Sequence, residues 1–160
     1  MKNYEYTFED YATNILPSRV EMMESLLPHA FRVDKLFGKG SGERGVVKKL
    51  GRMMDFKGVY AFARQGKIIY IGTSEKVINR VVYHVKGHTK YQAHLAWEIA
   101  REKGLWVNKK MGIPDLDSAK KEVGKLNVLF MEVTSPIERY LLEVYAAMHF
   151  NCKFNVFEGK

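Results

Sequence analysis

The sequence has almost no cysteine and no long apolar run. Only Cys152 occurs among 160 residues, so an intramolecular disulfide and a cysteine-rich zinc site are both excluded. No uncharged apolar stretch approaches the roughly 20 residues that cross a bilayer. The opening MKNYEYTFED is polar and mixed in charge, unlike a signal peptide. We therefore expect a cytoplasmic protein of a reducing compartment, with no membrane partner.

The chain also has fewer acidic than basic residues. The chain carries 26 Lys and Arg residues against 18 Asp and Glu residues, a formal net charge of +8. A small basic protein attracts polyanions, of which nucleic acid is the usual one, although solubility alone could also account for such a charge. With 46% hydrophobic residues, the chain has enough apolar mass for one compact core.

The spacing of apolar residues indicates both helices and strands. Residues 1–36 show helical spacing, and a glycine-rich loop follows over 37–45. Two strands flank Gln65-Gly66, and a nearly uncharged strand, KLNVLFMEV, lies later in the chain. The remaining segments are expected to form helices over about 74–86, about 90–103 and from 135 onward, with an irregular insert between the second and third of these and a possible short strand over 152–157.

The hairpin GVYAFARQGKIIYIG carries a tyrosine in each arm, Tyr60 and Tyr70. With a two-residue loop at Gln65-Gly66 the two phenols would face opposite sides of the sheet. With a three-residue loop, Arg64 to Gly66, they would pair directly. Composition alone favours neither register.

Glu138 is a carboxylate expected to point toward the buried side of the last helix. We place Ile137, Leu141, Leu142, Tyr145 and Met148 on that face and Glu143 on the outer side. An inward carboxylate is costly unless it is paired, hydrogen-bonded or bound to a cation. Ser135-x-x-Glu138 also matches a capping box, with Pro136 as the first helical residue. A helix cap and a metal ligand are therefore both possible interpretations of Glu138.

Several motifs together resemble the GIY-YIG endonuclease superfamily. Gly58-Val59-Tyr60 and Tyr70-Ile71-Gly72 stand for the two name-giving motifs, and Arg80 and His84 follow on the next helix. ERYLL, beginning at Glu138, and Asn155 resemble the last two motifs. The match spans about residues 58–157. It departs from the family where Val59 replaces isoleucine, and where Cys152 stands at a position that often holds proline.

The resemblance implies a fold and a mechanism. The fold is α+β, with a small central antiparallel sheet of about three strands flanked by helices and an N-terminal helical extension. Glu138 would hold one divalent cation, expected to be Mg²⁺ with Mn²⁺ as a substitute. Tyr60 would act as general base or proton relay, and the two tyrosines would share one face through the three-residue loop.

The other implied roles concern the substrate. Tyr70 would position the phosphate or water, Arg80 would bind the scissile phosphate, and His84 would share the proton of the base or contact phosphate. The residues expected to bind or accommodate DNA are Gly72, Lys76 and Asn155.

The implied function is metal-dependent hydrolysis of DNA, and double-stranded DNA is the expected partner. Residues 1–57 would form a DNA-binding or dimerisation extension, and 58–157 the catalytic core with an insert at about 88–126. These additions favour a sequence-specific, restriction-type enzyme that could pair as a homodimer. A phage- or repair-type nuclease of low or structure-based specificity is the alternative, and a non-catalytic nucleic-acid-binding module is the alternative of another class.

Overall fold

The computed structural model describes residues 4–157, and its centre is a four-stranded sheet in the order β1-β6-β2-β3. β2 (Gly58–Arg64) and β3 (Lys67–Ser74) form the predicted hairpin, and β6 (Asn127–Glu132) pairs with β2. The two-residue strand β1 (Phe31–Arg32) pairs with β6. All pairings are antiparallel, which confirms the predicted class; β1 is a strand that the sequence did not reveal.

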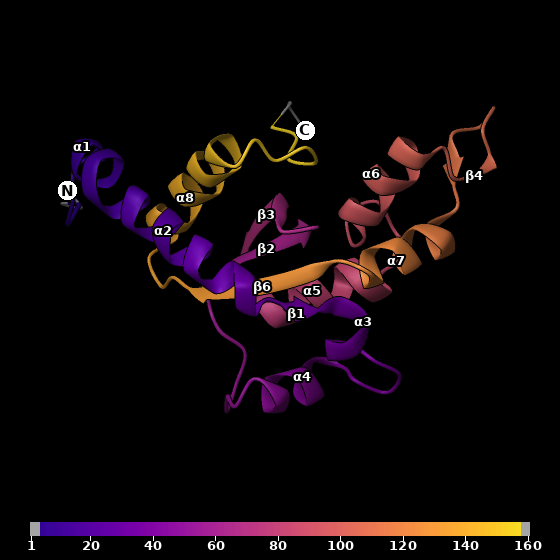
Figure 1. Cartoon of the computed structure of the whole chain (residues 1–160), viewed down its shortest axis with the longest axis horizontal. Helices are drawn as coiled ribbons and strands as arrows, with labels where there is room; N and C mark the ends of the chain where they lie inside the picture. Colours follow the sequence, from indigo (N-terminus) through magenta and orange to yellow (C-terminus); the bar gives the residue numbers. More distant parts are fainter. Residues whose placement is uncertain (1–3, 158–160) are drawn as a thin grey trace.

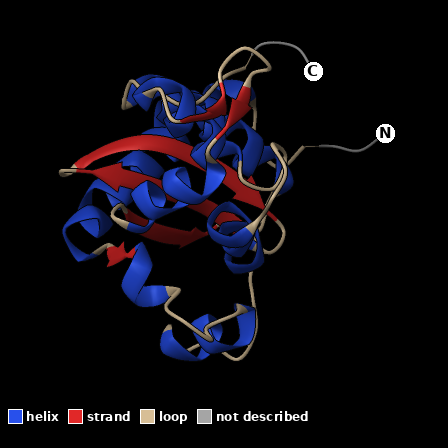
Figure 2. Ribbon diagram, turned by 90° about the vertical axis from the view of Figure 1, so that its right-hand side faces the viewer, coloured by secondary structure: helices blue, strands red, loops and turns tan. Residues whose placement is uncertain are grey.

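Helices cover both faces of the sheet, as the two ribbon views show (Figures 1 and 2). Because both faces are covered, β2 is buried from its first residue to Ala63, which explains its unbroken apolar run. One face packs against α3 (Val33–Leu36), α4 (Glu43–Lys49), α5 (Val77–Lys86), α6 (His94–Lys103) and α7 (Leu116–Gly124). The other face packs against α2 (Leu16–Leu26) and α8 (Pro136–His149).

The N-terminal extension, predicted to be helical, begins as one continuous helical rod. It consists of α1 (Phe8–Asp10), a π-helical segment (Tyr11–Ile15), α2 and a 3₁₀ turn (Leu27–His29). Pro17 lies in the first turn of α2, has no N–H and clashes with a regular helical carbonyl four residues back. The preceding turn is wound as a π-helix, in which the Leu16 N–H donates to the Tyr11 carbonyl. The chain thus accommodates the proline without breaking the rod.

Residues before Gly58 do not form a separate body. Val20 and Met23 of α2 lie in one core, while Val33 and Val46 lie in the other. The predicted extension is therefore built into the same fold as the hairpin. None of the described helices is long and apolar enough to cross a membrane.

The predicted irregular insert contains a small two-stranded sheet. β4 (Trp106–Asn108) and β5 (Ile113–Pro114) pair antiparallel and project beyond α6 and α7 (Figure 1). Residues 152–157, expected as a short strand, instead form turns and irregular backbone along the free edge of β3. There Phe154 donates its N–H to the Ile69 carbonyl.

Candidate active site

The hairpin places both tyrosines on one face by a route that the sequence did not predict. Its loop has two residues, Gln65 and Gly66, both with positive φ (51° and 75°), so the three-residue loop was wrong. A bulge next to the loop leaves Ile69 without a partner on β2 and shifts the register. Beyond the bulge, Tyr60 lies opposite Gly72, and Phe62 lies opposite Tyr70. The two phenols are therefore diagonal neighbours on the same face, with ring centroids 6.3 Å apart.

Tyr60 is buried and held at its hydroxyl. Its ring lies across Gly72, where an added Cβ would come within 2.2 Å of the phenolic oxygen. His84 reaches that oxygen from α5 through Nε2 at 2.8 Å. The expectation that Gly72 leaves room for the DNA backbone is not supported, because the space over Gly72 is filled by Tyr60.

Burial sets the protonation of this cluster. Tyr60 is 1% exposed, and desolvation raises its pKa well above 10. Burial also raises the pKa of Tyr70 and lowers the pKa of His84 well below 6.5. The positive charge of Arg80 opposes the rise at both phenols and adds to the fall at His84. At neutral pH both phenols and the imidazole are therefore neutral.

The hydrogen bonds favour one tautomer of His84. Its Nδ1 is buried and has no hydrogen-bond partner among the described residues. A buried N–H without a partner is rarer than an unused lone pair, so the ring proton belongs on Nε2, which donates to the Tyr60 oxygen. The Tyr60 hydroxyl proton is then free to point toward the neighbouring Tyr70, whose ring centroid is 6.3 Å from that of Tyr60. His84 is thus arranged to stabilise negative charge on Tyr60.

Arg80 supplies positive charge beside the phenols. Its two terminal nitrogens donate to the carbonyls of Gln92 (3.0 Å) and Tyr91 (2.9 Å), in the segment that leads into α6. These acceptors are carbonyl groups, which do not neutralise the charge of the guanidinium. A guanidinium that is held in place but not neutralised is suited to bind an anion.

His94 lies at the start of α6 and was not among the predicted site residues. Its ring centroid is 6.1 Å from that of Tyr70, and partial burial lowers its pKa. It therefore belongs to the surroundings of the tyrosines.

The structure does not bring Glu138 to the tyrosines. Its carboxylate accepts a hydrogen bond from Nε of Arg19 on α2 at 2.5 Å, so it forms an ion pair between two helices on the opposite face. Ser135 caps α8 as predicted, accepting from the Glu138 N–H at 3.3 Å. The position of the Glu138 side chain is thus explained by its ion pair with Arg19, and the prediction that it holds the metal needs correction.

Glu143 is the carboxylate of α8 that reaches the site. One of its oxygens lies 3.5 Å from the Thr73 hydroxyl on β3, and its charge raises the pKa of both Tyr60 and Tyr70. The prediction that Glu143 lies on the outer side was wrong, because α8 is rotated from the expected orientation. Met148, expected to be buried, is 75% exposed.

The two adjacent alanines of α8 indicate which face of the helix is buried, and the sequence prediction did not use them. The face of α8 that is buried contains Ala146 and Ala147, together with Leu142 and Arg139. Small side chains let a helix approach a sheet closely, so this pair marks the inner face better than the larger residues do. Glu143 lies one turn before Ala146 and Ala147 and therefore faces β3.

Asn155 secures the edge of β3. Its side-chain oxygen accepts from the Ile71 N–H at 2.9 Å, and its side-chain nitrogen donates to the Ile71 carbonyl at 2.8 Å. These bonds occupy the amide group, so Asn155 is placed to hold the strand between Tyr70 and Gly72 and not to contact DNA. Lys76 is exposed at the start of α5, away from these bonds.

The donors at the β3 edge suit a hard cation. The Glu143 carboxylate and the Thr73 hydroxyl are both oxygen donors, which Mg²⁺ and Mn²⁺ accept. No group of three or more His, Cys, Asp or Glu side chains that could hold a metal occurs among residues 4–157. A cation held by one carboxylate keeps its remaining positions for water and phosphate oxygens, as Mg²⁺ prefers.

The comparison with solved structures finds GIY-YIG domains. The N-terminal endonuclease domain of UvrC from Thermotoga maritima, bound to magnesium as its catalytic divalent cation, is 19% identical with a TM-score of 0.41. The match covers 72% of this chain and 100% of that one. A point mutant of the same domain, also with its cation, gives the same identity and TM-score over 72% and 99% of the two chains. The chain is similar to these domains. No protein-family model and no curated protein matches the sequence.

Proposed function

We propose that this protein is a metal-dependent endonuclease that hydrolyses phosphodiester bonds in double-stranded DNA, with a site of the GIY-YIG type. The observation that carries the proposal is the arrangement at the edge of β3. Two phenols, a neutral histidine, a guanidinium held by two carbonyls and a carboxylate come together there, from segments that the chain separates by up to about eighty residues. Packing alone requires none of these groups to meet.

Tyr60 is the proposed general base. As a phenolate it would take a proton from the attacking water at its oxygen, and Nε2–H of His84 would stabilise the negative charge until that proton arrives. The positive charge of Arg80 favours the same ionisation. Because burial raises the pKa of Tyr60, only a small fraction is ionised at neutral pH, and the reaction should speed up as the pH rises.

Arg80 and Tyr70 are the proposed phosphate-binding groups. Arg80 is held by two carbonyls and keeps further N–H donors for a phosphate oxygen. Tyr70 is 8% exposed, against 1% for Tyr60, so its hydroxyl is the better placed of the two to orient the phosphate or the water. Asn155 holds β3 between Tyr70 and Gly72 in place by bonding both backbone groups of Ile71.

Glu143, in place of Glu138, is the proposed ligand of the cation, with the Thr73 hydroxyl beside it. When bound, the cation would offset the charge that develops on the phosphate and on the leaving oxygen. The negative charge of Glu143 otherwise raises the pKa of Tyr60, so a bound cation would also remove an obstacle to ionisation of the base.

Sequence-specific cleavage of the restriction type is the finer proposal. The helical rod and α4 lie beside the catalytic sheet and provide surfaces that could read a duplex. A chain with one active site would need two copies to cut both strands of a palindrome, so we expect a homodimer on DNA. A repair-type nuclease with loose specificity would use the same chemistry.

Incubation of the purified protein with plasmid DNA, with and without Mg²⁺, tests the proposal. We expect cleavage that needs the cation, and sequencing of the ends would show one recognition site for a restriction-type enzyme or scattered ends for a less specific nuclease. DNA binding without cleavage across Mg²⁺, Mn²⁺ and several substrates would overturn the enzyme proposal in favour of a binding module.

A further inference from the structure

A basic surface cleft lies between α4 and the start of α5, on a different part of the molecule from the tyrosines. It has a volume of about 420 Å³. Figures 1 and 2 show α4 at the lower end of the molecule, joined to β2 by a long loop. The cleft is lined by Glu43, Arg44, Val47, Lys48, Arg52, Met53, Met54, Asp55 and Lys76.

Three of the cations in this cleft are not neutralised. Arg44 and Lys48 are exposed and four residues apart on α4, so they project from the same side of the helix. Lys76 is exposed at the start of α5. Within the described part of the chain, none of the three side chains forms an ion pair or a hydrogen bond. Like charges at this spacing are mildly destabilising in a helix, so this arrangement suits an anionic partner.

The two acidic residues of the cleft do not cancel this charge. The Asp55 carboxylate accepts the N–H groups of Ile78 and Asn79 (2.9 and 2.8 Å), and so caps α5. Glu43 lies in the first turn of α4, where a helix favours negative charge.

Arg52 is already engaged. Its guanidinium binds Glu132 at 3.1 Å and lies 3.7 Å from the centre of the Phe56 ring. Arg44, Lys48 and Lys76 are therefore the groups left to receive a ligand.

Two methionines project beside these cations. Met53 is 98% exposed and Met54 is 74% exposed, and both directly follow Arg52 in the chain. Large apolar side chains this exposed stand out on a charged surface, and proteins that bend DNA insert such side chains between base steps from the minor groove. A small anion would not use them, so the partner should be an extended polyanion with an apolar interior.

The cleft also leads toward the proposed catalytic arginine. The Arg80 N–H donates to the Lys76 carbonyl at 3.0 Å, which places the two residues one helical turn apart on α5. One turn advances about 5.4 Å, less than two nucleotide steps of about 3.4 Å along a strand. A backbone bound at Lys76 can therefore continue to Arg80.

We propose that this cleft is a second DNA-binding surface, in which Arg44, Lys48 and Lys76 bind backbone phosphates beside the cleaved bond. Met53 and Met54 contact the groove next to those phosphates. The inference rests on the proposed function, because it takes DNA to be the substrate. It assigns to α4 and its following loop the task of holding the duplex while the β3 edge carries out the reaction.

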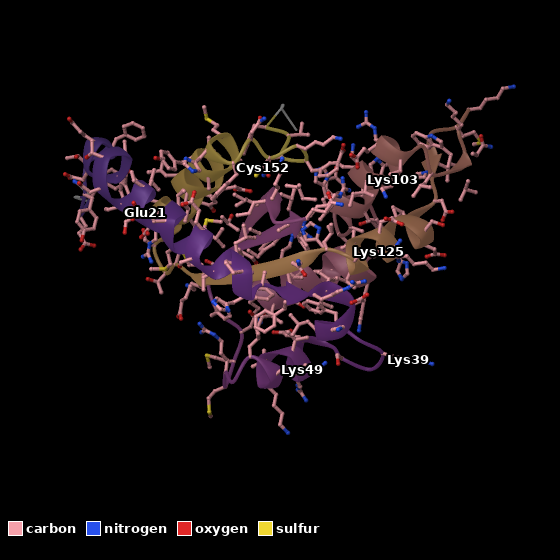
Figure 3. The ribbon with its side chains drawn as sticks, in the orientation of Figure 1. Glu21, Lys39, Lys49, Lys103, Lys125 and Cys152 are labelled. Atoms are coloured by element: carbon pink, nitrogen blue, oxygen red, sulfur yellow. The ribbon has the colours of Figure 1, made fainter. Side chains whose placement is uncertain are left out.

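The salt dependence of DNA binding tests the assignment. A triple variant, Arg44→Gln with Lys48→Gln and Lys76→Gln, is compared with a control that loses the same charge from the insert, Lys109→Gln with Lys110→Gln and Lys121→Gln. Lys109 and Lys110 lie in the β4–β5 hairpin, which Figure 1 shows at the upper right, away from α4, and Lys121 lies on α7. Lys49 marks the tested region in Figure 3, and its own side chain is bound to the Leu36 carbonyl and the Ser41 hydroxyl.

Affinity for a short labelled duplex is measured without divalent cation, from about 50 to 300 mM salt. Three lost phosphate contacts should reduce the slope of log K against log salt by about 2.7 and weaken binding about tenfold or more at low salt. The double variant Met53→Ser with Met54→Ser should weaken binding severalfold without changing the slope. Circular dichroism melting confirms that each variant is folded.

The outcomes separate this inference from the proposed function. If the wild type cuts DNA but the triple variant matches the control in slope and affinity, the cleft proposal fails and the nuclease proposal stands. If the wild type neither binds nor cuts DNA, both fail. A loss of slope confined to the triple variant supports the cleft.

Discussion

Substitutions of the two glutamates of α8 should have different effects, because Glu138 contributes to stability and Glu143 to the proposed catalysis. Glu138 forms the ion pair with Arg19, in which the side chains are 12% and 29% exposed. This exposure lies between that of a surface pair, which contributes up to about 1 kcal/mol, and a buried pair, whose disruption costs about 3–5 kcal/mol. Glu138→Gln keeps an acceptor for Arg19, so we expect a loss of about 1–2 kcal/mol in the free energy of unfolding. That loss corresponds to about 3–6 °C in Tm for a domain of this size.

Glu143→Gln should leave the free energy of unfolding nearly unchanged but slow cleavage strongly. The change keeps the shape of a half-buried side chain, so the free energy of unfolding should stay within about 0.5 kcal/mol of wild type. The cleavage rate should fall about 10³-fold or more, because the proposed cation loses its only charged protein ligand. Thermal melting, single-turnover cleavage with Mg²⁺ and duplex binding are measured for both variants. If Glu138→Gln abolishes cleavage while remaining stable, and Glu143→Gln cuts at the wild-type rate, the assignment of the carboxylates is refuted.

Three further results are expected. Gly72→Ala places a Cβ about 2.2 Å from the Tyr60 oxygen, so it should break the 2.8 Å contact with His84 and slow cleavage at least about 100-fold; a variant with the wild-type rate would refute this. Because burial raises the pKa of Tyr60, the cleavage rate should climb with pH between about 6 and 9, at up to about tenfold per unit, and a flat profile would exclude a phenolate base. The lowered pKa of His84 means that below about pH 6.5 the unfolded chain takes up a proton that the folded chain does not. The free energy of unfolding should therefore fall as the pH drops, by up to about 1.4 kcal/mol per unit in urea denaturation, and this decline should be smaller in His84→Gln.

The residues close to one another in the sequence were predicted well. The hairpin, the helix that carries Arg80 and His84, and the Ser135 cap follow from local spacing, because each depends on residues within a few positions. The family resemblance, and not local spacing, correctly placed Tyr60 and Tyr70 on one face, although through the wrong loop.

The features that were not predicted from the sequence depend on contacts between distant segments. The helix α2 decides which glutamate faces the site, because Arg19 forms an ion pair with Glu138. The buried alanines of α8 orient the helix so that Glu143 lies against β3. The strand β1 has only two residues, too few to show a pattern. The cleft beside α4 is assembled from residues about thirty positions apart, and its cations could not be assigned to one surface from their order alone.

The bulge at Ile69 bears on how related hairpins should be aligned. One unpaired residue within β3 has the same effect on which side the later residues face as one extra residue in the turn, since either shifts the count by one. The distance along the chain between Tyr60 and Tyr70 therefore says nothing about the length of the turn. An alignment with a hairpin that lacks the bulge needs its gap at residue 69, inside a strand, although gaps are usually placed in turns. A gap placed at Gln65 or Gly66 would still match the tyrosines, but it would pair each residue between the turn and the bulge with the wrong counterpart.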